Sequence, residues 1–201
     1  PTRIFAGDRP NHEKIGLILA NVRGAAEREG DLLAQVAATR VAERRILEIV
    51  DRHGADTVAA AMAALQDISE AQMRAAIEAL PDGVYEGVDY LDDGGPGDRP
   101  VAIRVRVEIS GDRARFDWSG TDDAIAGPLN TTPSIAGAAV FYVVKSLAGA
   151  AIQPNGGCYR PLEIITRPGS VLDPGPDKPV VGGNHETSQR AVDALFMAFE
   201  P

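Results

Sequence analysis

The sequence predicts an α+β protein with an N-terminal helical region, an antiparallel three-stranded meander, and then a mixed α/β C-terminal part. Apolar residues recur with a helical period of about 3.6 up to residue 80. From residue 84 to residue 118 they alternate with polar residues, as in a half-buried strand. Since the period changes at Pro81–Gly83, we expect a helical region over residues 1–82 and a mixed region over 83–201.

The first 82 residues are expected to form several helices. An apolar face over residues 12–22 predicts the first of them. Asp31 is a good N-cap for a long helix that Gly54 ends. The later helices expected are residues 56–65 and one that starts at the capping box Ser69–Gln72 and is broken at Leu80–Gly83.

Strands and two further helices are expected after Gly83. The meander strands are residues 84–91, 101–109 and 113–118. They are followed by an apolar helix over 134–147, a short strand over 162–166 and a final helix over 187–199.

Composition excludes several classes of partner. The formal net charge of −9 and the isoelectric point near 4.8 argue against nucleic acid or an anionic membrane as partner, because both would be repelled. One cysteine, Cys158, excludes an internal disulfide and fits a reducing compartment. The sequence has no apolar run of about 18 residues and no signal peptide, which favours a cytoplasmic protein. The absence of an initial Met and the stop after an apolar helical pattern predict an excerpt of a longer polypeptide.

Several chemistries lack their sequence motifs. The histidines at positions 12, 53 and 185 are too scattered for a metal motif, and there is no Cys-x-x-Cys. Neither a phosphate-binding loop nor a G-x-S-x-G elbow is present. We therefore expect this chain alone to bind no cofactor and no catalytic metal.

Three loops dense in Gly and Asn carry the candidate site residues. They are residues 127–133, 154–161 and 182–190. Asparagine and arginine side chains and loop amides are the donors that stabilise a developing oxyanion. His185 and Glu186 are the adjacent acid/base-capable pair in these loops. The candidates are Asn130, Asn155, Arg160, Asn184, His185, Glu186 and Arg190.

Within the last loop, Gly183–Glu186 are predicted to form a polar lip at the N-terminus of the final helix, facing the loops around Asn130 and Asn155. The alternative is that Asn184 only caps the helix. A further candidate is Asp117, which ends an alternating strand where polar groups converge. It could equally be a turn-capping residue.

The motifs in this order resemble the hydantoinase B/oxoprolinase family, which includes B subunits of ATP-dependent hydantoinases and the alpha subunit of acetone carboxylase. The stretches that carry the resemblance are residues 21–23, 30–38, 73–74, 80–83, 116–121, 127–130, 155–161, 168–170 and 183–190. Thr39 departs from the pattern, which has Asn there, and residues 6–10 match nothing in it.

The resemblance implies part of a B-type subunit of an ATP-dependent hydrolase of cyclic amides, such as hydantoin, N-methylhydantoin or oxoproline. It implies a hetero-oligomer with a hydantoinase A-type subunit that binds ATP and phosphorylates a substrate oxygen. It also implies a divalent metal held by a segment upstream of this sequence. An acetone-carboxylase-like fragment and a non-catalytic assembly domain are the alternatives, and we expect the polar loops to converge only in an enzyme.

Overall fold

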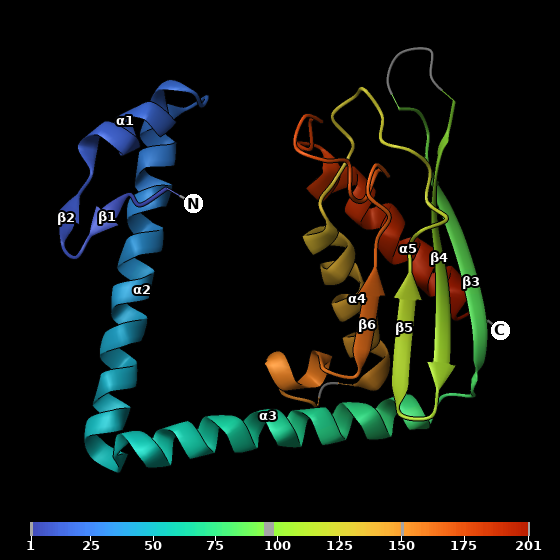
Figure 1. The fold of residues 1–201 in the computed structure, drawn as a ribbon, viewed down its shortest axis with the longest axis horizontal. Coiled ribbons are helices and arrows are strands. Elements are labelled where there is room, and N and C mark those ends of the chain that lie inside the picture. Colours follow the sequence, from blue (N-terminus) through green and yellow to red (C-terminus); the bar gives the residue numbers. More distant parts are fainter. Residues whose placement is uncertain (1, 95–98, 150, 201) are drawn as a thin grey trace. The chain divides into compact units, whose positions relative to one another are not determined.

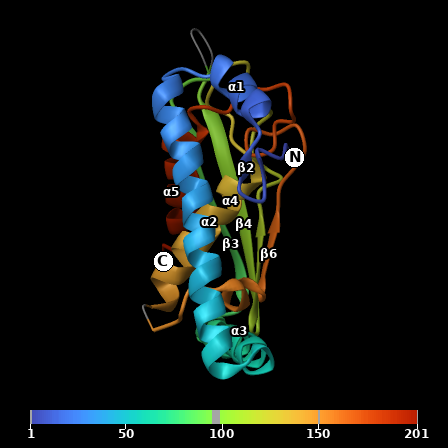
Figure 2. The ribbon, with the colours of Figure 1, turned by 90° about the vertical axis from the view of Figure 1, so that its left-hand side faces the viewer.

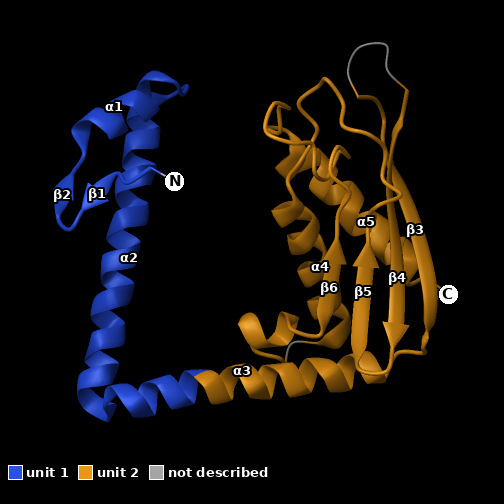
Figure 3. Ribbon diagram, in the orientation of Figure 1, with its two compact units in different colours: residues 1–62 blue, residues 63–201 orange. Residues whose placement is uncertain are grey.

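The structure is a computed structural model that describes residues 2–94, 99–149 and 151–200. The chain divides into two compact units, residues 1–62 and 63–201 (Figure 3). The division falls within helix α3 (Ala55–Glu78). The division expected at residue 83 coincides with the change from helix to strand, and as a domain boundary it stays a prediction.

The first unit contains a short hairpin, two helices and the first part of α3 (Figures 1 and 2). Its elements are β1 (Phe5–Ala6), β2 (Arg9–Pro10), α1 (His12–Ala20) and α2 (Ala25–His53). Arg40 of α2 lies over the ring of Phe5, at 5.5 Å, and forms an ion pair with Asp8 at 3.1 Å. Arg40 therefore holds the hairpin, which the sequence analysis missed, against α2.

Two expected helix boundaries are wrong. Helix α2 begins at Ala25 and passes through Gly30 and Asp31, so Asp31 is not its N-cap. Helix α3 is continuous through Ser69, because no Gly or Pro interrupts it there. The hydroxyl of Ser69 is buried and accepts a hydrogen bond from Asn155 instead of capping a helix.

The second unit is built on a four-stranded mixed sheet in the order β3-β4-β5-β6. The strands are β3 (Gly83–Leu91), β4 (Val101–Ser110), β5 (Arg113–Asp117) and β6 (Leu162–Ile165). The first three pair antiparallel in sequence order, as expected for the meander. The short strand expected near residue 162 pairs parallel to β5, so the sheet is mixed and larger than predicted.

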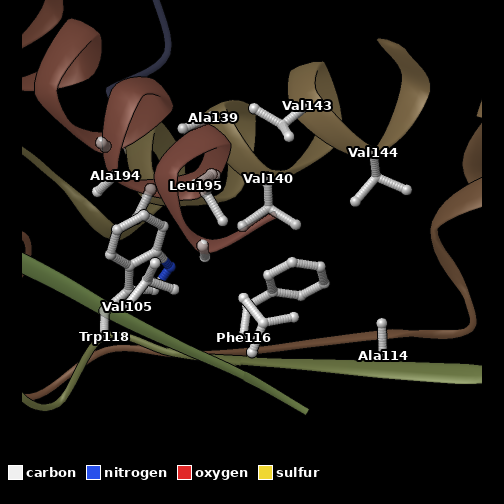
Figure 4. Packing of buried hydrophobic residues seen from close by; sticks show 14 of the residues in the cluster. Val105, Ala114, Phe116, Trp118, Ala139, Val140, Val143, Val144, Ala194 and Leu195 are labelled. Carbon is white, nitrogen blue, oxygen red and sulfur yellow. The ribbon is translucent and has the colours of Figure 1, made fainter. Parts of the chain in front are cut away.

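Helices α4 (Pro133–Ala148) and α5 (Ser188–Ala198) cover one face of the sheet. Side chains from β4, β5 and both helices point toward one another there, with Phe116 and Trp118 fully buried (Figure 4). A Cβ on Gly87 of β3 would overlap the carbonyl oxygen of Ala194, so this glycine lets α5 approach the sheet closely. Alternate β4 residues pack into this core, and the others face away from it.

Strand direction decides which loops meet. Strands β3, β5 and β6 run the same way, so the loops after them lie at one edge of the sheet, together with the start of α5 (Figure 1). We call it the carboxyl edge. The turn between β4 and β5 and the short helix η1 (Gly156–Tyr159), which precedes β6, lie at the opposite edge, the amino edge.

Candidate functional site

Two of the three polar loops meet at the carboxyl edge. The segment η2 (Gly183–Thr187) is a π-helical turn that leads directly into α5. Gly182 donates a backbone hydrogen bond of 2.9 Å to the carbonyl of Pro128, and the Thr187 hydroxyl donates to the carbonyl of Leu129. A Cβ on Gly183 would overlap the carbonyl of Asn130, so the close contact of the two loops requires this glycine.

Asn130 is fully buried and holds its own loop together. Its Oδ1 accepts from the amide of Ile125 at 2.9 Å. Its Nδ2 donates to the carbonyls of Ile125, Gly127 and Pro179 at 3.0–3.1 Å. Because these contacts use its donors and its acceptor, Asn130 is placed to order backbone rather than to bind a ligand.

The third loop, residues 154–161, lies at the amino edge instead (Figure 1). Asn155 caps η1, since its Oδ1 accepts from the amide of Gly157 at 2.8 Å, and its Nδ2 donates to Ser69 of α3 at 2.8 Å. The structure therefore does not bring Asn155 together with Asn130 and Asn184, contrary to expectation. The reason is topological: α4 and β6 carry the chain to the opposite edge and back between the other two loops.

Arg160 is also engaged with α3. Its guanidinium forms ion pairs of 2.9 Å with both Asp67 and Glu70 and donates to Gln66 at 2.7 Å. Hydrogen bonds from Arg160, and then from Arg74, lower the pKa of Glu70 below its ordinary value of 4.5. The cluster fastens the 154–161 loop to α3, which is a structural use of Arg160.

Glu70→Gln tests this fastening through its pH dependence. A lowered pKa in the folded protein means that ionised Glu70 stabilises the fold above its unfolded-state pKa, and that this stabilisation is lost as pH falls through the folded-state pKa. We therefore expect the variant to melt at a lower temperature than the original protein at pH near 7, and the difference to shrink below a pH of about 4.5. Melting curves across this range measure it; a constant difference would contradict the role of the charge.

A cleft opens at the carboxyl edge, and we call it the carboxyl-edge cleft. Its volume is about 390 Å³, which is within the usual range for small-molecule sites. Leu91 and Leu129 supply apolar surface and the other lining residues are polar. The lining residues are Tyr90, Leu91, Asp92, Asp93, Leu129, Glu186 and Arg190. They come from the end of β3, from the 127–133 loop and from the η2–α5 junction, so separate segments of the chain build one concave site.

The polar lip contributes Glu186 to this cleft and α5 contributes Arg190, whereas Asn184 and His185 are exposed and do not line it. Asn184 makes no side-chain capping hydrogen bond at the start of η2 or α5, so the alternative interpretation of Asn184 as a helix cap is wrong. The amides of His185 and Glu186 both donate to the carbonyl of Gly182. These amides are therefore engaged within the turn and are not donors for a bound oxyanion.

Asp117 belongs to a different cleft, on the sheet face away from α4 and α5. This sheet-face cleft has a volume of about 430 Å³ and is lined by Glu86, Gly87, Val88, Arg104, Val105, Arg106, Asp117, Ser119 and Gly120. Asp117 accepts from the amide of Ser119 at 2.9 Å, and hydrogen bonding to Ser119 is the main cause of its lowered pKa. Arg106 lies between Glu86 and Asp117 in register. Charges of opposite sign thus alternate across this face, as on a solvated sheet surface.

The carboxyl-edge cleft is the better candidate because it gathers acid/base-capable groups from three separate segments at the ends of the strands, whereas the sheet-face cleft lies on the strands themselves. Sequence reasoning found Glu186 and Arg190 and missed Tyr90, Asp92 and Leu129. Tyr90 and Asp92 lie at the end of β3, which runs in the same direction as β5, and this position could have identified them. The sequence alone does not give the strand order that is needed to recognise it.

Within the described residues, no group of three or more His, Cys, Asp or Glu side chains is arranged to hold a metal ion. The metal that the resemblance implies is expected on a segment upstream of this sequence, and we assign none of the described residues to it. No helix in the described ranges has the length and apolar character needed to cross a membrane.

Comparison with known sequences identifies relatives. The sequence model of the family described as hydantoinase B/oxoprolinase matches residues 1–201. The chain is 30% identical to the caprolactamase subunit beta of Pseudomonas jessenii over 201 residues, covering 100% of the chain and 34% of that protein. It is 31% identical to a 5-oxoprolinase of Dictyostelium discoideum over 184 residues, covering 88% of the chain and 14% of that protein. The chain thus spans about a third or less of these relatives.

Solved structures share the fold. An ATP-dependent caprolactamase from Pseudomonas jessenii superposes with a TM-score of 0.89 at 29% identity, covering 100% of this chain and 34% of that one. A nucleotide-free acetone carboxylase superposes with a TM-score of 0.83 at 15% identity, covering 98% of this chain and 28% of that one. The second likeness concerns the fold alone.

Proposed function

The chain belongs to the hydantoinase B/oxoprolinase family, and from this membership and the carboxyl-edge cleft we propose that it is part of a B-type subunit that hydrolyses a cyclic amide with the help of ATP. The observation that carries the proposal is the cleft itself, in which Glu186 and Arg190 lie with Leu129 and the end of β3 in one concave site. One relative is named a subunit and a solved relative is named ATP-dependent, so we propose that a partner subunit of the A type supplies the ATP.

The proposed reaction opens a carbon–nitrogen bond of the ring. Transfer of a phosphoryl group from ATP to the amide oxygen, on the partner, activates the ring carbon. Water adds to that carbon, the carbon–nitrogen bond breaks with a proton delivered to nitrogen, and a second water releases phosphate. The products are a carboxylate and an amine. Nitrogen leaves far more readily when it is protonated, so a general acid is required in the site.

Glu186 is the group we assign to this proton transfer: its carboxylate accepts a proton from the attacking water and then delivers that proton to the nitrogen. It lines the cleft at the start of α5, within a π-helical turn, and such turns are frequent at functional sites. Arg190 follows one helical turn later and lines the same cleft. Asn184 and His185 are exposed beside it, and we propose that they contact substrate or the partner rather than act as the acid.

The test is Glu186→Gln in the full-length protein assembled with its partner. Glutamine keeps the size of the side chain but cannot donate a proton, so kcat/KM for cyclic-amide hydrolysis should fall at least tenfold, or about 1.4 kcal/mol in the barrier. Melting temperature should stay within about 1 °C, because Glu186 is exposed. Asn155→Ala at the amino edge is the matched comparison. This variant should lower the melting temperature and leave kcat/KM of the folded protein nearly unchanged.

A second function is supported by a different observation. Three candidate residues make internal contacts instead of facing a cleft: Asn130, Asn155 and Arg160. The loop of residues 154–161 also lies at the amino edge, away from the other two loops. Both observations are compatible with a non-catalytic assembly domain. Tyr142 on α4 and Met197 on α5 are 60% and 46% exposed and could meet a partner. Full activity of Glu186→Gln, together with loss of the complex in Tyr142→Ala, would favour the assembly domain.

An acetone-carboxylase-like activity would be recognised by carboxylation of acetone without hydrolysis of any cyclic amide.

A further inference from the structure

The charges of the carboxyl-edge cleft do not balance. Its arginine, Arg190, has both guanidinium arms occupied by carboxylates of the same unit. One arm contacts Asp89 of β3 at 2.7 Å, and the other contacts Asp193 of α5 at 2.9 Å. The Asp89 side chain is only 13% exposed, so this ion pair is the better shielded of the two. The positive charge of Arg190 is thus compensated before any ligand enters.

Two carboxylates of the cleft have no such compensation. Asp92, at the end of β3, and Glu186, in η2, are both exposed and both line the cleft. Across residues 2–94, 99–149 and 151–200, neither of them has an ion-pair partner. Asp93 adds a third carboxylate to the lining. The cleft therefore presents net negative charge to a ligand.

This charge decides which cyclic amides the cleft favours. A substrate that carries its own carboxylate would bring a further negative charge into the cleft beside Asp92 and Glu186. Like charges about 4 Å apart repel each other appreciably near a protein surface, where the effective dielectric constant is about 20 rather than the value of about 80 in water. An uncharged ring meets no such repulsion and can pack against the partly exposed side chain of Leu129. The amine that ring opening releases becomes an ammonium ion, which these carboxylates stabilise.

We propose that the carboxyl-edge cleft selects uncharged cyclic amides over cyclic amides that carry a carboxylate. The proposal rests on the proposed function and adds the substrate class to it. It separates this chain from an oxoprolinase, because 5-oxoproline is an anion at neutral pH, whereas simple lactams and hydantoin are uncharged.

Two rings that differ by a single carboxylate provide the test: γ-butyrolactam and 5-oxoproline. The full-length protein with its partner subunit and ATP is assayed on each, at low and at high ionic strength. We expect kcat/KM for γ-butyrolactam to exceed that for 5-oxoproline about tenfold at low salt. Salt screens charges, so the preference should narrow at high ionic strength.

Asp92→Asn tests whether the Asp92 carboxylate causes the preference for γ-butyrolactam over 5-oxoproline. It removes one negative charge from the cleft without touching Glu186, the proposed acid, and should shrink the preference roughly threefold by improving hydrolysis of 5-oxoproline. Glu163→Gln is the matched control, because Glu163 is an exposed carboxylate near the amino edge, at the start of β6. It should leave the ratio of the two rates unchanged.

The outcomes separate the inference from the function on which it rests. A preference for 5-oxoproline, or a ratio that neither salt nor Asp92→Asn changes, overturns the substrate class and leaves cyclic-amide hydrolysis in place. Failure to hydrolyse either ring, with hydantoin and caprolactam also untouched, overturns the proposed function and the substrate class with it. The expected preference, narrowed by salt and by Asp92→Asn alone, supports both.

Discussion

Gly157→Ala is expected to destabilise the second unit by about 3 kcal/mol, at the upper end of the cost of overpacking. A Cβ at this position would overlap the backbone carbonyl of Gln66 on α3. Backbone cannot rotate away as a flexible side chain can, so either η1 or α3 must shift. A shift would also strain the hydrogen bond from Asn155 to Ser69 and the ion pairs of Arg160.

Gly156 offers a matched control next to it in the sequence. A Cβ on Gly156 would have the side-chain oxygen of Gln66 as its nearest neighbour, at 3.8 Å, which is an ordinary contact. Gly156→Ala should therefore change stability by less than about 0.5 kcal/mol. Urea unfolding of the two variants measures the contrast. Equal stability of the two variants would show that η1 does not pack on α3 as described.

The same glycines explain what the sequence could and could not predict. Gly157 and Gly183 belong to polar, Gly-rich motifs, a composition that is typical both of ligand-binding loops and of close backbone packing. The structure shows close packing at both positions. The sequence pattern cannot distinguish a ligand-binding loop from close backbone packing, because the backbone that each glycine approaches lies far away in the sequence. This backbone is that of Gln66 for Gly157 and of Asn130 for Gly183.

Local patterns predicted the elements well, and the long-range arrangement less well. The meander strands follow from the alternation of apolar and polar residues, which is a local property. The parallel pairing of β6 with β5 depends on the intervening helix α4 and has no local signal. This pairing sends residues 154–161 to the amino edge, and so separates Asn155 from the other candidates. Glu186 and Arg190 belong to one polar loop motif, residues 182–190, so a local pattern was enough to place them near each other.

Asn130→Ala is expected to cost about 4 kcal/mol of stability. Asn130 is fully buried, and its removal leaves the amide of Ile125 and the carbonyls of Gly127 and Pro179 without their partner. An unsatisfied polar group costs about 1–3 kcal/mol when it is buried, so the partly buried groups of Ile125 and Gly127 contribute more than the carbonyl of the exposed Pro179, and the lost side chain also leaves a small cavity. Because the same loop carries Leu129 into the carboxyl-edge cleft, loosening it should also weaken substrate binding.

Asn184→Ala is the control for Asn130→Ala, because comparing their stabilities distinguishes a buried asparagine that orders the backbone from an exposed one. Asn184 is exposed and makes no capping hydrogen bond, so its replacement should change stability by less than about 0.5 kcal/mol. Asn130→Asp is a useful third variant, since it keeps the acceptor for Ile125 but loses the donors and buries a charge; we expect it to be as destabilising as alanine. Thermal and urea unfolding of the three variants measures the order. If Asn130→Ala were as stable as Asn184→Ala, then the hydrogen bonds of Asn130 would not be what holds residues 125–130 against Pro179, and its side chain would again be available as a ligand donor at the carboxyl edge.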